Sequence, residues 1–358
     1  MNPNRLQSVL RKMADGGISQ MVVSDPAAIY YLTGKWIHPG QRMLALRLSL
    51  TGRHALFVNE LFSVPEELGV EKIWINDNQD GVELLAGSLD IERTVGIDKT
   101  WPARFLLRLM EVRPSHHFVN ASAILDRLRM RKDAEERELM REASRLNDLA
   151  LARIVALLPK RYSEKRLAQC VPEIYEELGA EGCSFEPIIA YGPNAAESHH
   201  APDRRLLNTG DSVIIDIGCR KDSYCSDMTR TVFYQEAPED ARAVYAIVLE
   251  AQRRAIAMVR PGVRFCDIDA AARDHIAAAG YAAQFTHRTG HSIGLDVHES
   301  GDVSAANTDP VQPGMVFSIE PSVKVPGKFG IRIEDLVLVT EDGCDVLNRH
   351  DKALRIVS

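Results

Sequence analysis

The chain has 358 residues, of which 45% are hydrophobic and 26% are charged, and its formal net charge is -7. This composition is typical of a globular protein long enough for two domains, and the negative charge gives no support to a nucleic-acid partner. Residues 1–20 carry charges throughout and no run of about 18 apolar residues occurs, so we expect no signal peptide, no membrane partner and a cytoplasmic location.

The first part of the chain alternates short apolar runs rich in β-branched residues with helical patterns. Strands are predicted at residues 21–24, 43–48, 54–58, 71–75, 94–98 and 116–119. Helices are predicted between them at residues 26–32, 80–89 and 102–112. This alternation predicts a small α/β domain.

The composition changes near residues 120–133, where a charge-dense segment begins. From Leu125 onward, apolar residues recur with helical spacing, which predicts one long amphipathic helix. We therefore place the domains at 1–124 and 125–358. Further helices are predicted at 164–178, 239–259 and 266–279, and strands at 185–191, 212–218, 227–234, 315–321 and 330–339. The second domain is predicted to be α+β with long antiparallel hairpins.

Four acidic residues of the second domain lie beside apolar runs, where an unpaired carboxylate is costly. Asp216 follows a buried-strand pattern, and Asp227 opens the next strand, so a hairpin would bring them together. Glu320 lies in VFSIEP. Glu334 lies in GIRIED, two residues after Arg332 and on the same face of a continuous strand. A salt bridge explains each acid taken singly, but it does not readily explain four.

The stretch GHSIGLDVHE, residues 290–299, adds His291 and His298. Its glycines favour a loop or short strand over a helix. Carboxylates together with one imidazole form a ligand set for two hard or borderline divalent ions, for which Mn²⁺ or Co²⁺ fits better than a structural zinc. The zinc motif HExxH is excluded, because Arg288 follows His287 where the motif needs glutamate.

The segments GHSIGLDVHE, IDIG followed by YCSDMTRT, SIEP and GIRIED together resemble the metal-dependent Xaa-Pro peptidases, the family of prolidase and aminopeptidase P. The resemblance covers nearly the whole chain. It implies an α+β fold in which a C-terminal pita-bread catalytic domain follows a small α/β creatinase-like N-terminal domain. It also implies two divalent metal ions, with Asp227 and Glu334 bridging them. The implied metal ligands are Asp216, Asp227, His291, Glu320 and Glu334.

The resemblance further implies two catalytic histidines that act on the substrate, His298 and His199. We choose His199 over the adjacent His200, because GPNAAESH matches the family pattern that leads to its histidine. His287 is interpreted as a supporting or structural residue.

Two further catalytic roles are implied by the same resemblance. Glu320 is expected to act as proton shuttle as well as ligand, and Arg332 to orient Glu334 or Asp227 or to hold charge in the pocket. A proline-shaped apolar pocket is expected, but its lining is not predicted.

The implied activity is hydrolysis of the Xaa-Pro bond at the N-terminus of short peptides, with Mn²⁺ favoured and Co²⁺ or Zn²⁺ as alternatives. The implied assembly is a homodimer. Two other classes are a non-catalytic binding relative and a metal-free hydrolase of the creatinase kind. The intact set of ligand residue types argues against both.

The sequence leaves the substrate length open. Many prolidases place an arginine after the second histidine to hold the dipeptide carboxylate, but residues 299–319 contain no Arg or Lys. Arg332, or His38 or Arg42 from a dimer partner, are the candidates for the missing charge. The short chain resembles the compact bacterial Xaa-Pro dipeptidases, so Xaa-Pro dipeptidase (prolidase) is slightly favoured over aminopeptidase P, which acts on longer peptides.

Overall fold

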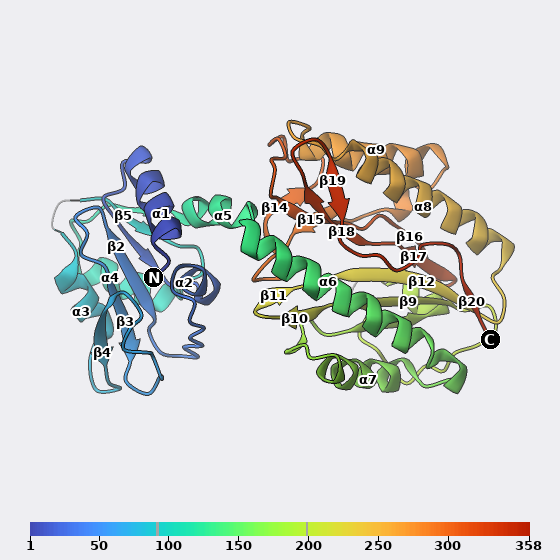
Figure 1. Ribbon diagram of the computed structural model, residues 1–358, viewed down its shortest axis with the longest axis horizontal. Coiled ribbons are helices and arrows are strands. Elements are labelled where there is room, and N and C mark those ends of the chain that lie inside the picture. Colours follow the sequence, from blue (N-terminus) through green and yellow to red (C-terminus); the bar gives the residue numbers. More distant parts are fainter. Residues whose placement is uncertain (91–92, 198–199) are drawn as a thin grey trace. The chain divides into compact units, whose positions relative to one another are not determined.

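The chain forms two units, Met1–Arg129 and Met130–Ser358, in a computed structural model that describes residues 1–90, 93–197 and 200–358 (Figure 1). The division falls at the end of helix α5 (Ser122–Met130), whereas the sequence analysis places it between residues 124 and 125, inside that helix. No helix among the described residues is both long and apolar enough to cross a membrane. The predicted catalytic residue His199 lies outside the described residues.

The first unit is built on a six-stranded mixed sheet of order β4-β3-β2-β1-β5-β6. Its strands are β1 (Gln20–Val23), β2 (Ala45–Ser49), β3 (Ala55–Asn59), β4 (Glu71–Ile75), β5 (Val95–Ile97) and β6 (Phe118–Asn120). The predicted helices are found as α2 (Pro26–Thr33), α3 (Gly81–Ser88) and α4 (Ala103–Val112). All six predicted strands are present, which confirms the α/β assignment.

Helix α1 (Pro3–Asp15) is an element that the sequence analysis does not predict. The Asn2 side chain accepts hydrogen bonds from the backbone of Asn4 and Arg5, and Pro3 occupies the first turn. An N-cap residue followed by proline is a recognised start signal for a helix. Val9 and Met13 form its buried face.

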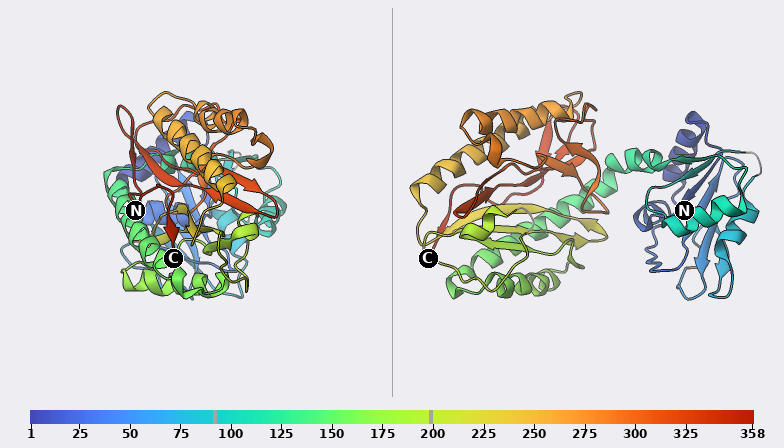
Figure 2. Two further views of the ribbon diagram at one scale, coloured as in Figure 1. Left: turned by 90° about the vertical axis from the view of Figure 1, so that its right-hand side faces the viewer. Right: turned by 180° about the vertical axis from the view of Figure 1, so that it is seen from behind.

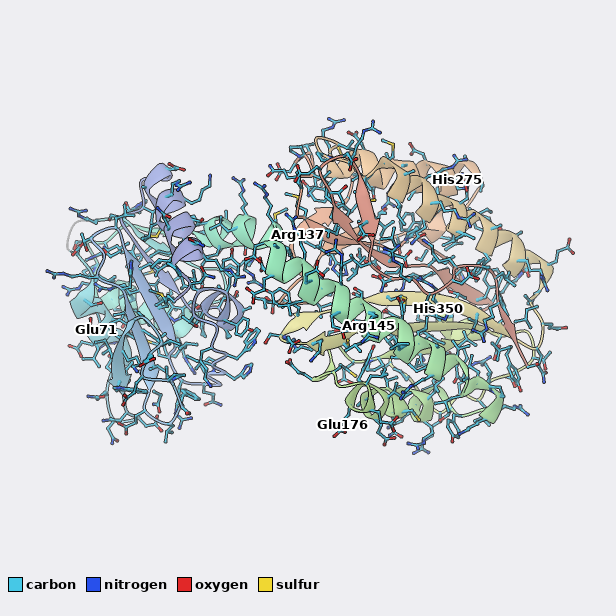
Figure 3. All side chains as sticks on the ribbon, in the orientation of Figure 1. Glu71, Arg137, Arg145, Glu176, His275 and His350 are labelled. Carbon is cyan, nitrogen blue, oxygen red and sulfur yellow. The ribbon has the colours of Figure 1, made fainter. Side chains whose placement is uncertain are left out.

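The long helix predicted from Leu125 is in fact two helices, α5 and α6 (Ala134–Val155). The Asp133 side chain accepts from the Glu136 backbone, and the Glu136 side chain accepts from the Asp133 backbone, which forms a capping box. This start signal lies inside a charge-dense segment whose pattern otherwise predicts one continuous helix. Figure 3 labels Arg137 and Arg145 along α6.

The second unit contains a five-stranded sheet, β14-β13-β15-β18-β19, a four-stranded sheet, β20-β12-β9-β8, and two smaller sheets, β11-β10-β7 and β16-β17. The strands are β7 (Gly182–Cys183), β8 (Ile188–Tyr191), β9 (Ser212–Ile217), β10 (Cys219–Lys221), β11 (Tyr224–Cys225), β12 (Met228–Tyr234), β13 (Gly290–Ser292), β14 (Glu299–Val303), β15 (Val316–Ile319), β16 (Ser322–Val325), β17 (Phe329–Arg332), β18 (Asp335–Val339), β19 (Cys344–Val346) and β20 (Ile356–Val357).

Helices α6 and α7 lie on one side of these strands, and α8 and α9 lie on the other (Figures 1 and 2). The remaining helices are α7 (Glu164–Glu177), α8 (Glu239–Met258) and α9 (Phe265–Ala278), with short 3-10 turns η1 (Leu158–Lys160), η2 (Gly192–Ala196) and η3 (Ala282–Gln284). The predicted β9–β12 hairpin is confirmed, and Asp216 lies opposite Thr229 in it.

The strand predicted at residues 330–339 is two strands that belong to different sheets. β17 pairs with β16, whereas β18 pairs with β15. Ile333 and Glu334 belong to neither ladder, and the Glu334 backbone N–H donates instead to the Thr229 carbonyl at 3.1 Å. The prediction of one continuous strand is therefore wrong, because the apolar alternation continues while the pairing partner changes.

Two hydrophobic cores flank the strands that carry the predicted ligands. Ile217 and Met228 belong to the core shared by α6, α7, β9 and β12. Ile319 and Ile333 belong to the other core, shared by α8, α9, β15 and β17. Each of these residues is the sequence neighbour of a predicted acidic ligand, so the acids are held between two packed layers.

Candidate metal centre

One cavity of about 490 Å³ in the second unit brings together the residues predicted to form the site. Its walls include Asp216, Asp227, His291, His298, Glu320, Arg332 and Glu334. These side chains come from strands or from positions directly beside strand ends. The backbone ladders of the two larger sheets and of the β16–β17 pair therefore fix the positions of the residues around the cavity.

His291 lies at the centre of the cluster, on β13. Its Nε2 atom is 3.6 Å from Asp227 Oδ2 and 3.6 Å from Glu320 Oε1. Its backbone N–H donates to Ser318 Oγ at 3.0 Å. The preceding residue must be glycine, because a Cβ on Gly290 would lie 1.8 Å from the Ser318 carbonyl oxygen. The close approach of β13 to β15 at Gly290 therefore holds the His291 imidazole beside the carboxylates of Asp227 and Glu320.

Three of the predicted ligands converge closely enough to share an ion. One ligand atom from each of Asp227, His291 and Glu334 lies within 4.8 Å of the others, and all three residues are buried. Burial and then the charge of Glu334 raise the pKa of Asp227 well above its usual range. Burial and then the charge of Glu320 do the same for the pKa of Glu334. Such mutual repulsion is relieved by bound cations.

The donor set fits divalent metal ions. Asp216 Oδ1 and Asp227 Oδ1 are buried and have no hydrogen-bond partner among the described residues. Burying a carboxylate oxygen in this way costs free energy unless a bound cation offsets its charge. Burial lowers the pKa of His291 to about 3, so its imidazole is neutral and can offer a lone pair. Carboxylate oxygens with one imidazole suit Mn²⁺, Co²⁺ or Zn²⁺.

Arg332 contacts a different carboxylate from the two that the sequence analysis expects. Its guanidinium forms a buried ion pair with Asp216, and its Nε donates to Thr229 Oγ1 at 3.0 Å. The Thr229 hydroxyl in turn donates to Glu334 Oε2 at 2.6 Å. Among the described contacts, Arg332 thus pairs directly with Asp216 and is linked to Glu334 through Thr229, which lies opposite Asp216 on the neighbouring strand.

The two histidines near the centre differ in their surroundings. His298 is exposed at the cavity wall, and its ring meets the His291 ring edge-on at 4.3 Å between centroids. His287 is tied to the protein, with Nδ1 2.7 Å from the Arg288 carbonyl oxygen and Nε2 2.6 Å from Ser322 Oγ. These contacts agree with the interpretation of His287 as a supporting residue.

Several residues of the cavity wall are not predicted from the sequence. Phe185, Ile188 and Val297 provide apolar surface beside the acidic cluster. Lys324, which is 8% exposed, also lines the cavity, and burial lowers its pKa to about 8. A lysine between two valines in SVKV is the signal that could have found it, because the alternation marks a side chain facing away from the core.

A second group of acidic and imidazole side chains, Glu164, His200 and Asp203, lies outside this cavity. The Glu164 carboxylate is fully buried and accepts from the Tyr191 backbone, the Asn194 amide and the Asp203 backbone. It also contacts His200 Nε2 at 2.7 Å. These hydrogen bonds occupy the carboxylate, so Glu164 ties the start of α7 to β8, to η2 and to His200 and Asp203.

We expect His200 to make stability depend on pH. Burial lowers its pKa, but hydrogen bonds and charges from Glu164 and Glu197 outweigh this, so the pKa is raised. A raised pKa in the folded state gives stability that is fully present below the usual value of about 6.5 and is lost as pH rises through the folded-state pKa. The difference in unfolding free energy between wild type and His200→Asn, measured by urea unfolding, should therefore shrink with rising pH. A difference that grows with pH would contradict this role.

The comparison with known families agrees with this geometry. Residues 138–341 match the model of metallopeptidase family M24, and residues 5–131 match the creatinase/prolidase N-terminal domain. The chain belongs to metallopeptidase family M24. An uncharacterized peptidase of Staphylococcus haemolyticus is 32% identical over 360 residues, which cover 98% of this chain and 100% of the relative.

Solved structures of M24 relatives share the whole fold. A dipeptidase from Pyrococcus horikoshii is 34% identical with a TM-score of 0.92, and the match covers 99% of this chain and 100% of that one. A prolidase from Thermococcus sibiricus is 32% identical with a TM-score of 0.95 and full coverage of both chains, 100% each. The predicted pita-bread catalytic domain with a creatinase-like N-terminal domain is confirmed.

Proposed function

We propose that this M24 metallopeptidase is a Xaa-Pro dipeptidase that uses two divalent metal ions, with Mn²⁺ favoured. The observation that carries the proposal is one cavity in which four carboxylates and a neutral imidazole converge beside apolar wall residues. The dipeptidase and prolidase names of two relatives, each matched over at least 99% of this chain, support the substrate class.

The proposed ligand roles are those that the resemblance implies, and the convergence of Asp227, His291 and Glu334 supports them. Asp227 and Glu334 would be shared by the two ions, while Asp216, Glu320 and His291 would complete the ligand set. When bound, the cations supply an activated water and polarise the scissile carbonyl. Arg332 would hold Asp216 in place through their ion pair.

The remaining steps are assigned to side chains at the cavity surface. Glu320, whose side chain is 13% exposed, would take a proton from the attacking water and pass it to the leaving nitrogen. His298 would donate a hydrogen bond to the substrate and to the developing oxyanion. His199 is proposed for the same task on the resemblance alone. Phe185 and Ile188 would contact the proline ring.

The alternative within the family is an aminopeptidase P that acts on longer peptides. It is less favoured, because the similar structures described above carry the names dipeptidase and prolidase. The homodimer and the cytoplasmic location stay predictions. Of the two N-terminal candidates for a substrate-carboxylate cation, Arg42 is paired with Asp77 at 2.7 Å, and the His38 ring stacks on Trp36.

The proposed function is tested by stripping the protein of metal, restoring Mn²⁺, Co²⁺ or Zn²⁺ and assaying Ala-Pro, Ala-Pro-Ala and Ala-Ala. We expect activity only after a metal is restored, and kcat/KM for Ala-Pro at least tenfold above that for Ala-Pro-Ala, or about 1.4 kcal/mol in transition-state binding. Ala-Ala is the control without a proline ring and should be a poor substrate. A tenfold preference for the tripeptide would instead support aminopeptidase P.

A further inference from the structure

Three basic side chains line the metal cavity among the residues that the structure describes: Arg288, Lys324 and Arg332. Two of them are already directed at acidic groups of the protein. Arg332 pairs with Asp216 inside the cavity, and Arg288 Nη1 donates to Asp302 Oδ1 at 2.5 Å. These two guanidinium groups therefore already have acidic partners, and Lys324 also has an interaction within the protein.

Lys324 is placed in the wall by the pairing of β16 with β17. Lys324 lies opposite Gly330, and Ser322 lies opposite Arg332. Ser322 and Lys324 are two residues apart on one strand, so they share a face. Ser322 Oγ contacts His287, which also lines the cavity, and this common face is therefore the cavity face.

The strand opposite Lys324 is held by backbone packing. A Cβ on Gly330 would lie 1.8 Å from the Ala195 carbonyl oxygen, so β17 lies directly against η2. Lys324 is only 8% exposed and lines the cavity, so most of its side chain is covered by protein. An ammonium has three N–H donors, so a contact with one protein group leaves donors for a ligand.

The charge balance of the cavity favours an anionic ligand group. The four ligand carboxylates offset two divalent cations, and Arg332 is directly paired with one of these acids. Lys324 adds a further positive charge. In an Xaa-Pro dipeptide the C-terminal carboxylate lies on the proline itself, inside the cavity, where it needs a cation to offset its desolvation. In a longer peptide the same position is a neutral amide.

We propose that Lys324 binds the C-terminal carboxylate of Xaa-Pro dipeptides and so sets the preference for dipeptides over longer peptides. This inference rests on the proposed function and deepens it. Lys324 on β16 would thus take the place of the carboxylate-binding arginine that many prolidases carry in the segment equivalent to residues 299–319.

The kinetic test compares Lys324→Met, which keeps the length of the side chain but removes its charge, with wild type on Ala-Pro and on Ala-Pro-amide. KM for Ala-Pro should rise at least tenfold while kcat changes little, because the ion pair is present in both ground and transition states. Values for Ala-Pro-amide should stay within about twofold. An equal loss of kcat/KM on both substrates would overturn the proposal.

Two variants serve as controls. Lys324→Arg keeps the charge and should retain most of the preference for Ala-Pro. Lys328→Met removes a lysine from the exposed β16–β17 turn, where it pairs with Asp240 at 3.3 Å, and should leave both substrates unaffected. A preference that Lys324→Arg loses as fully as Lys324→Met would count against a charge-based role.

A binding measurement separates this inference from the proposed function. Calorimetric titration of the Mn²⁺-loaded protein with L-proline and L-prolinamide needs no turnover. Lys324→Met should weaken L-proline binding at least tenfold and leave L-prolinamide binding unchanged. Equal L-proline affinity in wild type and variant, or no L-proline binding to wild type, would overturn the proposal. If wild type cleaves no Xaa-Pro peptide but binds L-proline through Lys324, the proposed function fails and the carboxylate site stands.

Discussion

Replacing Asp227 with asparagine is expected to lower kcat/KM for Ala-Pro by about 10³-fold or more, which corresponds to several kcal/mol of transition-state stabilisation. The substitution preserves the shape of a buried side chain but removes the charge that two cations would share. His291 Nε2 lies 3.6 Å from the Asp227 carboxylate, so the imidazole would lose a neighbouring ligand group as well. Glu334→Gln should behave in the same way.

The measurement combines kinetics with elemental analysis and circular dichroism. We expect fewer than two metal ions per chain and an unchanged fold. Asp240→Asn is the matched control, because Asp240 lies in the exposed first turn of α8, where it accepts from the Ala241 backbone and pairs with the surface residue Lys328. A folded Asp227→Asn protein with wild-type turnover would show that Asp227 does not bridge the ions.

His298→Ala is expected to lower kcat by about 10²-fold, the scale of losing one hydrogen-bond donor to an oxyanion. His298 is exposed on the cavity wall and meets the His291 ring edge-on, so its loss removes a substrate-facing group and leaves the carboxylates in place. The metal content should therefore stay at two ions per chain.

Steady-state kinetics and elemental analysis of the same sample separate the two roles. His275→Ala, on α9 (labelled in Figure 3), is the control and should keep full activity, since it does not line the cavity. Loss of a metal ion from His298→Ala would place His298 among the ligands instead of among the groups that act on the substrate.

The acidic residues of the centre could be predicted because each follows or precedes an apolar run. An acidic residue at the end of a buried strand is costly unless it has a partner, so its presence there points to a site. The β9–β12 hairpin then brings Asp216 and Asp227 together. The sequence could not predict the break at Ile333, because apolar alternation persists through it. Only the change of pairing partner from β16 to β15 shows where one strand ends.

The partners of Arg332 and the orientation of Lys324 could not be predicted from the sequence either. Arg332 reaches Asp216 across strands that are far apart in the chain, and Thr229 mediates its link to Glu334. The direction of Lys324 depends on the register of β16 against β17. Helix α1, by contrast, carried a readable start signal in Asn2 and Pro3.

The adjacency of ligands and core residues constrains how this protein can change during evolution. Asp216 and Ile217, like Ile333 and Glu334, are neighbours in sequence, yet one side chain faces the cavity and the other is packed in a core. A register slip of one residue would exchange these two positions and place a carboxylate in the hydrophobic layer. Insertions are therefore tolerated only in the loops, while new substrate preferences can arise by point substitution on the cavity wall.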